Sequence, residues 1–174
     1  MLWTFPERVE LHKGRPVSLS PAPNRRHQSL VGYLFRKLAD HTEPLGCETF
    51  IAPFDVRLPV SSVEGKVDTV VQPDLCVICD ESKLERQGCN GAPDLIVEVV
   101  SPKNRSNDTR EKFGLYEAAG VPEYWIVFPK EDTISVFVLR DGRYVGLQPA
   151  SAPGILTSVT LPGFSIDLEA AFAR

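Results

Sequence analysis

The sequence has no apolar run long enough to cross a membrane, which would need about 18 consecutive apolar residues. The segment from Met1 to Glu7 also lacks the basic start and apolar core of a secretory signal peptide. These two absences predict a cytoplasmic protein without a membrane partner.

A strong excess of one charge is missing too. The net charge is −4 and charged residues make up 24% of the 174 residues, which argues against a protein that coats nucleic acid with a basic surface. It does not exclude an enzyme that touches nucleic acid at one local patch. There are no repeats, low-complexity segments or inter-domain linkers. With a hydrophobic content of 43%, the chain is expected to form one α/β domain over residues 1–174.

Cysteine is scarce, with four residues at positions 47, 76, 79 and 89. In a cytoplasmic protein we expect all four to be reduced. Cys76 and Cys79 form a lone CxxC in an apolar segment, and strand geometry would send their side chains to opposite faces. This disfavours a zinc or redox site and favours two small buried side chains.

The remaining sequence predicts alternating strands and helices. We expect an irregular N-terminal arm over about residues 1–23 with one short strand at 16–19, a helix at 24–41, and strands at 50–60 and 67–80, the second interrupted by Pro73. A polar loop at 80–91, which fits one helical turn, precedes a strand at 94–100 and a helix at 108–119. Strands at 123–128, 133–139 and 143–147 follow, with a short C-terminal helix docked by Leu168 and Phe172. Asp141-Gly142 predicts a hairpin turn.

The helix expected at 24–41 begins after Asn24, a favourable N-cap. Its apolar residues form a core-facing stripe, and four basic residues lie off this stripe: Arg25, Arg26, Arg36 and Lys37. His27 lies on the line of the stripe. It fits either a packed, partly buried histidine or one that leans into an active site.

Residues 94–100 are apolar on both faces, which is typical of a central strand. Glu98 lies in the middle of this run. A carboxylate is costly to bury unless a metal ion or a lysine pairs with it. We therefore take Glu98 as the centre of a candidate site.

Asp74 and Lys112 are the partners we expect for Glu98. Neighbouring strands lie about 4.8 Å apart, so Asp74 and Glu98 could bind one cation if their strands pair. Two carboxylates, a backbone carbonyl and water suit Mg²⁺ or Mn²⁺, and a lysine could orient or deprotonate the attacking water. Lys112 and Tyr116 share one helix side with Asp108, and four basic residues between positions 101 and 112 form a positive lip that suits phosphates.

Each of these residues also has a structural explanation. Asp74 could stabilise a turn after Pro73, Lys112 could be a solvated helix lysine, and Asp108 could be an N-cap in a capping box with Glu111. Asp94 shares the face of Glu98 but lies too far along the strand for the same ion. The aromatic side chains of residues 116, 124 and 125 fit a core or an interface better than a substrate-stacking surface.

The chain resembles the PD-(D/E)xK nuclease superfamily, and more narrowly the Uma-type endonuclease group, a bacterial domain of unknown function. The matching residues are Gln72-Pro73-Asp74, Ala92 to Pro102, Asp108, Lys112, Tyr116 and Gly120 to Val127, with weaker matches at Ser20-Pro21 and His27. The resemblance implies a restriction-endonuclease-like fold, with a mixed central β-sheet flanked by helices.

It also implies metal-dependent cleavage of phosphodiester bonds. Asp74, Glu98 and the backbone carbonyl of Val99 would hold Mg²⁺ or Mn²⁺, and Lys112 would be the catalytic lysine. We expect DNA as the substrate. The candidate supporting residues are His27, Ser101, Asp108 and Tyr116.

Two departures from the family pattern stand out. Val100 occupies the usual place of the ExK lysine, which Lys112 could replace from the following helix. Phe128-Pro129 stands where family members often have Asp-Pro. This second departure and the acidic net charge fit the alternative of a catalytically inactive nuclease-fold module that binds or regulates. We also expect a homodimer, because duplex cleavage needs two sites and the strands at 123–128 and 133–139 offer apolar surface.

Overall fold

A computed structural model describes residues 9–19, 24–60, 66–101 and 107–173, without the side chains of residues 107 and 108. Its helices are α1 (Arg25–Thr42), α2 (Asn107–Ala119) and α3 (Leu168–Phe172), with 3₁₀ turns at Glu43–Leu45 and Glu81–Lys83. Its strands are β1 (Val9–His12), β2 (Arg15–Ser18), β3 (Glu48–Ile51), β4 (Val56–Arg57), β5 (Val70–Val71), β6 (Leu75–Ile78), β7 (Leu84–Glu85), β8 (Gly88–Asn90), β9 (Leu95–Val99), β10 (Glu123–Phe128), β11 (Thr133–Arg140), β12 (Arg143–Gly146), β13 (Ala150–Ser151), β14 (Ile155–Thr157) and β15 (Ser165–Asp167).

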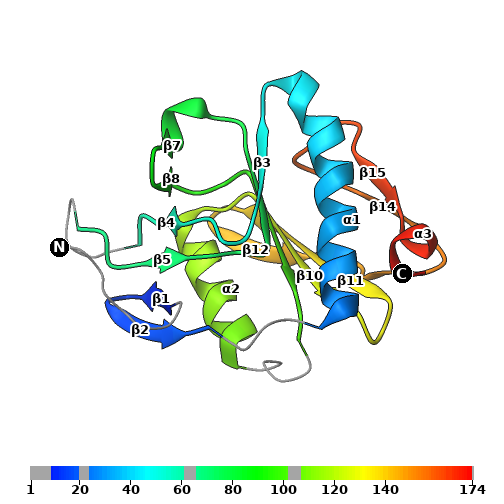
Figure 1. The fold of residues 1–174 in the computed structure, drawn as a ribbon, viewed down its shortest axis with the longest axis horizontal. Helices are drawn as coiled ribbons and strands as arrows, with labels where there is room; N and C mark the ends of the chain where they lie inside the picture. The colour runs from blue at the N-terminus through cyan, green and yellow to red at the C-terminus, as the bar shows by residue number, and fades with distance from the viewer. Residues whose placement is uncertain (1–8, 20–23, 61–65, 102–106, 174) are drawn as a thin grey trace.

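The strands form a large mixed sheet and two smaller sheets (Figure 1). The large sheet has the order β12-β11-β10-β9-β6-β3, with β13 paired to β11. Strands β9 and β10 are parallel, whereas β6 runs antiparallel to β9. A second sheet has the order β2-β1-β5-β4-β8-β7, and β14 pairs with β15. The expected α/β fold with a mixed sheet is confirmed.

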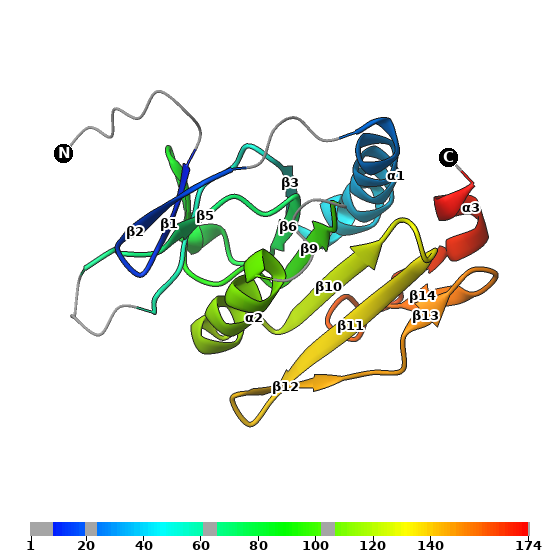
Figure 2. The same cartoon turned by 90° about the horizontal axis from the view of Figure 1, so that it is seen from below.

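Helices cover both faces of the large sheet. Figure 2 shows α1 and α2 on opposite sides of it. One core cluster joins α1, α3 and the inward side chains of residues 95, 97 and 99. The other joins Leu115 and Tyr116 of α2 to Ile96 and to apolar residues of the second sheet. Since β9 lies between β10 and β6 and is packed on both faces, the prediction of a central strand is confirmed.

Both long helices agree with the sequence. Asn24 caps α1, because its Oδ1 accepts a hydrogen bond from the backbone N–H of His27 at 2.9 Å. Helix α2 begins at Asn107 and ends before Gly120, which has a φ of +82°. A glycine adopts that left-handed conformation without the steric cost of a Cβ. Because α2 begins at Asn107, Asp108 lies inside its first turn and is not the N-cap that was predicted.

Four segments differ from the predictions. The expected strand at 67–80 is two strands in different sheets, β5 and β6, separated by Pro73. The expected strand at 50–60 is two strands in different sheets, β3 and β4, because Pro53 lies between them and a proline cannot donate to a strand ladder. The part of the N-terminal arm from residue 9 to residue 19 is a regular hairpin, β1–β2, and only its second strand was expected. The expected loop at 80–91 has the one helical turn that its sequence fits, a 3₁₀ turn, but it also holds the unexpected β7–β8 hairpin.

The C-terminal half follows the predictions more closely. Strands β10, β11 and β12 lie where expected, and Asp141 and Gly142 both have the positive φ of a tight hairpin turn. Leu168 and Phe172 of α3 are buried, as predicted. Strands β13, β14 and β15 are short additions that the sequence did not reveal. No helix in the described part of the chain combines the length and apolar character that a membrane crossing needs.

Candidate active site

Asp74 and Glu98 lie on paired strands. In the antiparallel pairing of β6 with β9, Leu75 is opposite Val97. Asp74 directly precedes β6, so the same register places it opposite Glu98. The two side chains retain 22% and 16% exposure. The adjacency that the predicted cation site requires is therefore present.

Helix α2 supplies two partners to Glu98. Lys112 Nζ lies 3.0 Å from Glu98 Oε1, and the Tyr116 hydroxyl donates to the same oxygen at 2.7 Å. Their spacing of four residues places both on the helix face toward β9. Lys112 is only 5% exposed, so the alternative of a solvated helix lysine is wrong. Tyr116 is fully buried and is both a core residue and a partner of Glu98.

Asp74 is held from two other elements. Its Oδ2 accepts a hydrogen bond from the backbone N–H of Val99 at 2.8 Å. His27 Nε2 of α1 lies 3.3 Å from the same oxygen. His27 is 7% exposed, so it is buried and also directed toward the site, and the two explanations of this histidine hold together.

The site raises the pKa of several groups, among them Glu98 and His27. Burial raises the pKa of Glu98 to about 7, and the negative charges of Asp74 and Glu10 add to this effect against the opposing influence of Lys112 and Tyr116. For His27, burial lowers the pKa, but the hydrogen bond and charge of Asp74 outweigh it and the net shift is upward. A carboxyl group that ionises near neutral pH within a partly open site is typical of functional positions.

Glu10 and His12 of β1 also reach this site, and sequence reasoning missed both. Lys112 Nζ lies 2.9 Å from Glu10 Oε1, and His12 Nε2 lies 2.9 Å from Glu10 Oε2. Both side chains are buried, at 1% and 0% exposure. A signal was available in Lys13-Gly14, a hairpin turn sequence between two short segments, and these two residues have the positive φ of such a turn.

The other predicted residues are less central. Ser101 is half-buried at the end of a described segment, and the side chain of Asp108 lies outside the description. Asp94 accepts a hydrogen bond from the backbone N–H of Cys79, as expected for a residue at the entry of a strand. Of the predicted positive lip, Lys103 and Arg105 lie outside the described residues.

A divalent cation is compatible with the oxygen atoms of the site. Among the described residues, no three His, Cys, Asp or Glu side chains form a group that could hold a metal ion. Two carboxylates are nevertheless a typical protein contribution to a Mg²⁺ site, where water fills the other positions. Glu98 uses Oε1 and Asp74 uses Oδ2 for the hydrogen bonds above, and within the described chain Glu98 Oε2 and Asp74 Oδ1 accept none.

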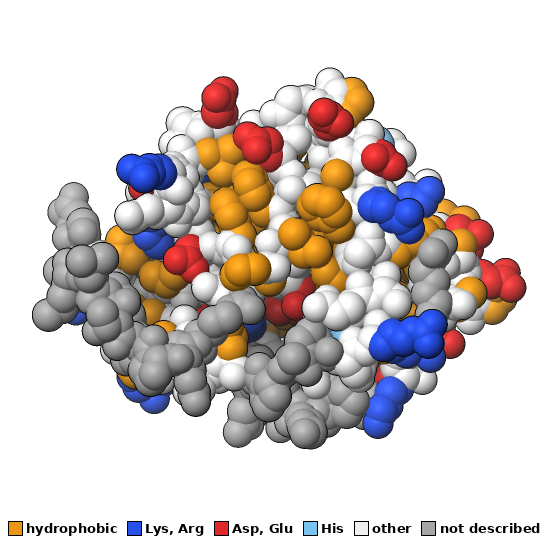
Figure 3. Space-filling view, in the orientation of Figure 1, with side chains coloured by type: hydrophobic (Ala, Val, Ile, Leu, Met, Phe, Trp, Pro, Cys, Tyr) orange, Lys and Arg blue, Asp and Glu red, His pale blue; other side chains and the backbone are white. Residues whose placement is uncertain are grey.

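Helix α1 carries exposed basic side chains. Its exposed cations are Arg25, Arg26, Arg36 and Lys37. Figure 3 shows Lys and Arg side chains along the α1 side of this face. Arg25 and Arg36 are eleven residues apart, which is about three turns, so they lie on one line along the helix. Arg26 is paired with Asp132 at 2.6 Å.

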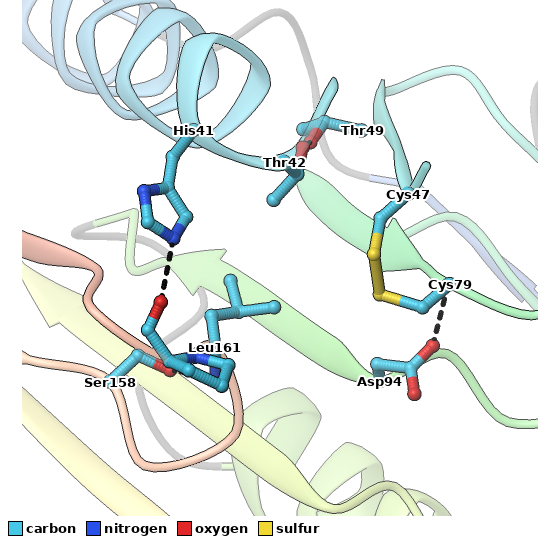
Figure 4. Close-up of a disulfide and its surroundings, with 9 residues drawn as sticks. His41, Thr42, Cys47, Thr49, Cys79, Asp94, Ser158 and Leu161 are labelled. Atoms are coloured by element: carbon cyan, nitrogen blue, oxygen red, sulfur yellow. Dashed lines mark hydrogen bonds between the residues drawn. A yellow bond between two sulfur atoms is a disulfide. The ribbon is translucent and has the colours of Figure 1, made fainter. Parts of the chain in front are cut away.

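The cysteines do not form the arrangement expected. Cys47 and Cys79 form a disulfide (Figure 4), so the prediction that all four are reduced is wrong for this pair. The reason is the β3–β6 register, in which Glu48 is opposite Ile78 and the next residues outward are the two cysteines. Cys76 and Cys89 are free and buried, and burial raises the pKa of both thiols.

Comparisons with known proteins agree with this architecture. Residues 4–169 match the model of the Uma2 family, whose description is "Putative restriction endonuclease". The structure is similar to the crystal structure of a "putative nuclease belonging to DUF820" from Anabaena variabilis, with a TM-score of 0.75 and 15% sequence identity over 97% of this chain and 93% of that chain. No curated protein matches the sequence. Because the family model spans nearly the whole sequence, the chain belongs to the Uma2 family.

Proposed function

We propose that the chain is a Mg²⁺- or Mn²⁺-dependent endonuclease that hydrolyses phosphodiester bonds in DNA. The observation that carries the proposal is the meeting of Asp74, Glu98 and Lys112, with Lys112 Nζ 3.0 Å from Glu98. Membership of a nuclease-like family supports the reaction class.

Asp74, Glu98 and the backbone carbonyl of Val99 would hold the cation. When bound, a divalent cation lowers the pKa of coordinated water and stabilises charge on a phosphodiester in transit. Lys112 places an ammonium group at this point, where it can orient the attacking water and offset negative charge that develops on the phosphate. Tyr116 and His27 fix the carboxylates of Glu98 and Asp74 through the contacts described above.

Nucleic acid is the partner that the surface supports. Helix α1, which contributes His27 to the site, carries four exposed cations, and with a net charge of −4 these form a local basic feature of the chain. Such a patch can neutralise backbone phosphates without base readout. We propose that residues 1–174 act as one domain, because β1 and α2 meet at Lys112.

A homodimer remains a prediction, but one of its two reasons, the apolar surface of the strands, is wrong. Strand β10 is buried along almost its whole length and β11 alternates between buried and half-buried residues, so neither offers a broad apolar surface. A mass measurement by solution scattering would test the dimer, and a monomeric mass at working concentrations would contradict it.

A catalytically inactive binding module is the second candidate. It is favoured by the ion pair of Glu98 with Lys112, which gives the carboxylate a protein partner in the absence of a cation. It is also favoured by Phe128, which lies at the end of β10 and packs against the same apolar cluster as Tyr116.

Cleavage of supercoiled plasmid with Mn²⁺ or Mg²⁺ tests the proposal. The wild type should nick the plasmid, Glu98→Gln should not, and the exposed control Glu85→Gln should behave like the wild type. Nicking that persists in Glu98→Gln would refute a site centred on Glu98. A wild type that neither nicks the plasmid nor binds Mn²⁺ in calorimetry would favour the inactive module.

A further inference from the structure

Glu10 enters the candidate site from a different sheet. It lies on β1, in the second sheet, whereas Glu98 lies on β9 in the large sheet. Lys112 Nζ is 2.9 Å from Glu10 Oε1 and 3.0 Å from Glu98 Oε1. The ammonium group therefore bridges two carboxylates that come from separate layers of the fold.

The two oxygens of Glu10 are already engaged. Oε1 accepts the backbone N–H of Gln72 at 2.8 Å and contacts Lys112, and Oε2 contacts His12 Nε2 at 2.9 Å. Burial raises the pKa of Glu10, but the hydrogen bond from His12, the charge of Lys112 and the Gln72 N–H outweigh it and hold the pKa at about 2. Glu10 is therefore ionised, and both of its oxygens are engaged by protein groups, whereas Glu98 Oε2 accepts no hydrogen bond within the described chain.

His12 ties this carboxylate to α2 a second time. Its Nε2 lies against Glu10 and its Nδ1 lies 3.4 Å from Glu111 Oε1. The hairpin itself is anchored, since the N–H of Lys13 donates to Thr69 Oγ1 at 3.2 Å and Gly14 N–H donates to the carbonyl of Asp68. Glu10 thus has a fixed position relative to Lys112.

We propose that Glu10 is a positioning residue that holds the Lys112 ammonium group beside Glu98. The physical need is clear from the burial of Lys112. A buried ammonium requires a carboxylate partner, and Glu98 cannot serve alone if its charge is shared with a cation. The proposal rests on the proposed function, in which Lys112 acts at the scissile phosphate.

The test compares Glu10→Gln with the wild type and with Glu85→Gln, whose glutamate lies on β7, an edge strand of the same sheet. NMR of ¹⁵N-labelled lysine reports on Lys112 directly, because an ammonium group bound by two buried carboxylates exchanges its protons slowly. We expect a Lys112 signal in the wild type and in the control, and its loss in Glu10→Gln. Mn²⁺ affinity should stay near the wild-type value in Glu10→Gln, while plasmid cleavage should fall about 100-fold, as expected when a catalytic group is displaced.

The outcomes separate this proposal from the proposed function. A Lys112 signal that is unchanged in Glu10→Gln overturns the positioning role, whether or not the wild type cleaves DNA. Loss of Mn²⁺ binding in a folded Glu10→Gln variant also overturns it, because Glu10 would then be a ligand. Absence of wild-type cleavage refutes the nuclease alone. If Glu10→Gln does not fold, Glu10→Asp keeps the charge but withdraws it by one methylene, and the same loss of the Lys112 signal is expected.

Discussion

Replacing Glu98 by Gln should stabilise the metal-free protein at neutral and basic pH. Gln has the shape of the protonated glutamate. Its side-chain oxygen, at the place of Oε1, can accept the same hydrogen bonds from Lys112 and Tyr116. Its amide nitrogen would lie at Oε2, which accepts no hydrogen bond within the described chain. The substitution therefore removes charge while it preserves the contacts that the structure shows.

The raised pKa of Glu98 sets the size of the stability gain expected for Glu98→Gln. The pKa rises from an ordinary 4.5 to about 7, so the folded state binds a proton more tightly than the unfolded state. Below pH 4.5, Glu98 does not lower the free energy of unfolding, because it is protonated in both states. Its destabilising effect grows as the pH rises to about 7. Each pKa unit corresponds to 1.36 kcal/mol, so the full cost is about 3 kcal/mol as an upper limit. The advantage of Glu98→Gln should grow from near zero at pH 4 to this value at pH 8.

Urea denaturation in EDTA across this pH range measures the difference in the free energy of unfolding. A difference that does not change with pH, or a variant less stable than the wild type at pH 8, would refute the reasoning. Mn²⁺ at about 100 times its dissociation constant should then stabilise only the wild type, by about 2.7 kcal/mol.

Three further predictions concern other parts of the molecule. Unfolded, unreduced protein should show two free thiols, and removing the Cys47–Cys79 disulfide should cost about 3–4 kcal/mol for its 32-residue separation; four free thiols would contradict the pairing. Arg25→Gln and Arg36→Gln should each lower the slope of log binding constant against log salt for duplex DNA by about 1, and an unchanged slope would exclude these contacts. Glu123→Gln should lower the free energy of unfolding by about 2–4 kcal/mol, because this buried carboxylate accepts four hydrogen bonds. A loss below about 1 kcal/mol in urea denaturation would refute a stabilising role of these hydrogen bonds.

The parts of the fold that the sequence predicted are those with strong local patterns. The apolar run around Glu98 identified β9, and the cap at Asn24 identified the start of α1. The grouping of Asp74, Glu98 and Lys112 was expected because the family pattern and the helix spacing both indicated it. In each case the information lies within a few turns of helix or a few residues of strand.

The parts that could not be predicted depend on pairing between distant segments. Glu10 reaches Lys112 because β1 pairs with β5 at Leu11 and Val70 and the hairpin is anchored to residues 68, 69 and 72. Such contacts between distant segments leave no trace in local periodicity. The disulfide follows from the β3–β6 register. That register was hidden because residues 50–60 resembled one continuous strand.

The charges that meet at the site give a further reason to expect a divalent cation. Glu10, Asp74 and Glu98 supply three negative charges when ionised, against one positive charge from Lys112 and two histidines, His12 and His27, whose raised pKa values favour their protonated forms. A divalent cation would offset more of the carboxylate charge in this largely buried site than a monovalent cation would. Without a cation, burial and the nearby charges of Asp74 and Glu10 favour protonation of Glu98, so its pKa is raised, whereas the hydrogen bonds and the charge of Lys112 hold the pKa of Glu10 low. The same buried negative charge that destabilises the metal-free fold would thus favour Mg²⁺ or Mn²⁺ binding.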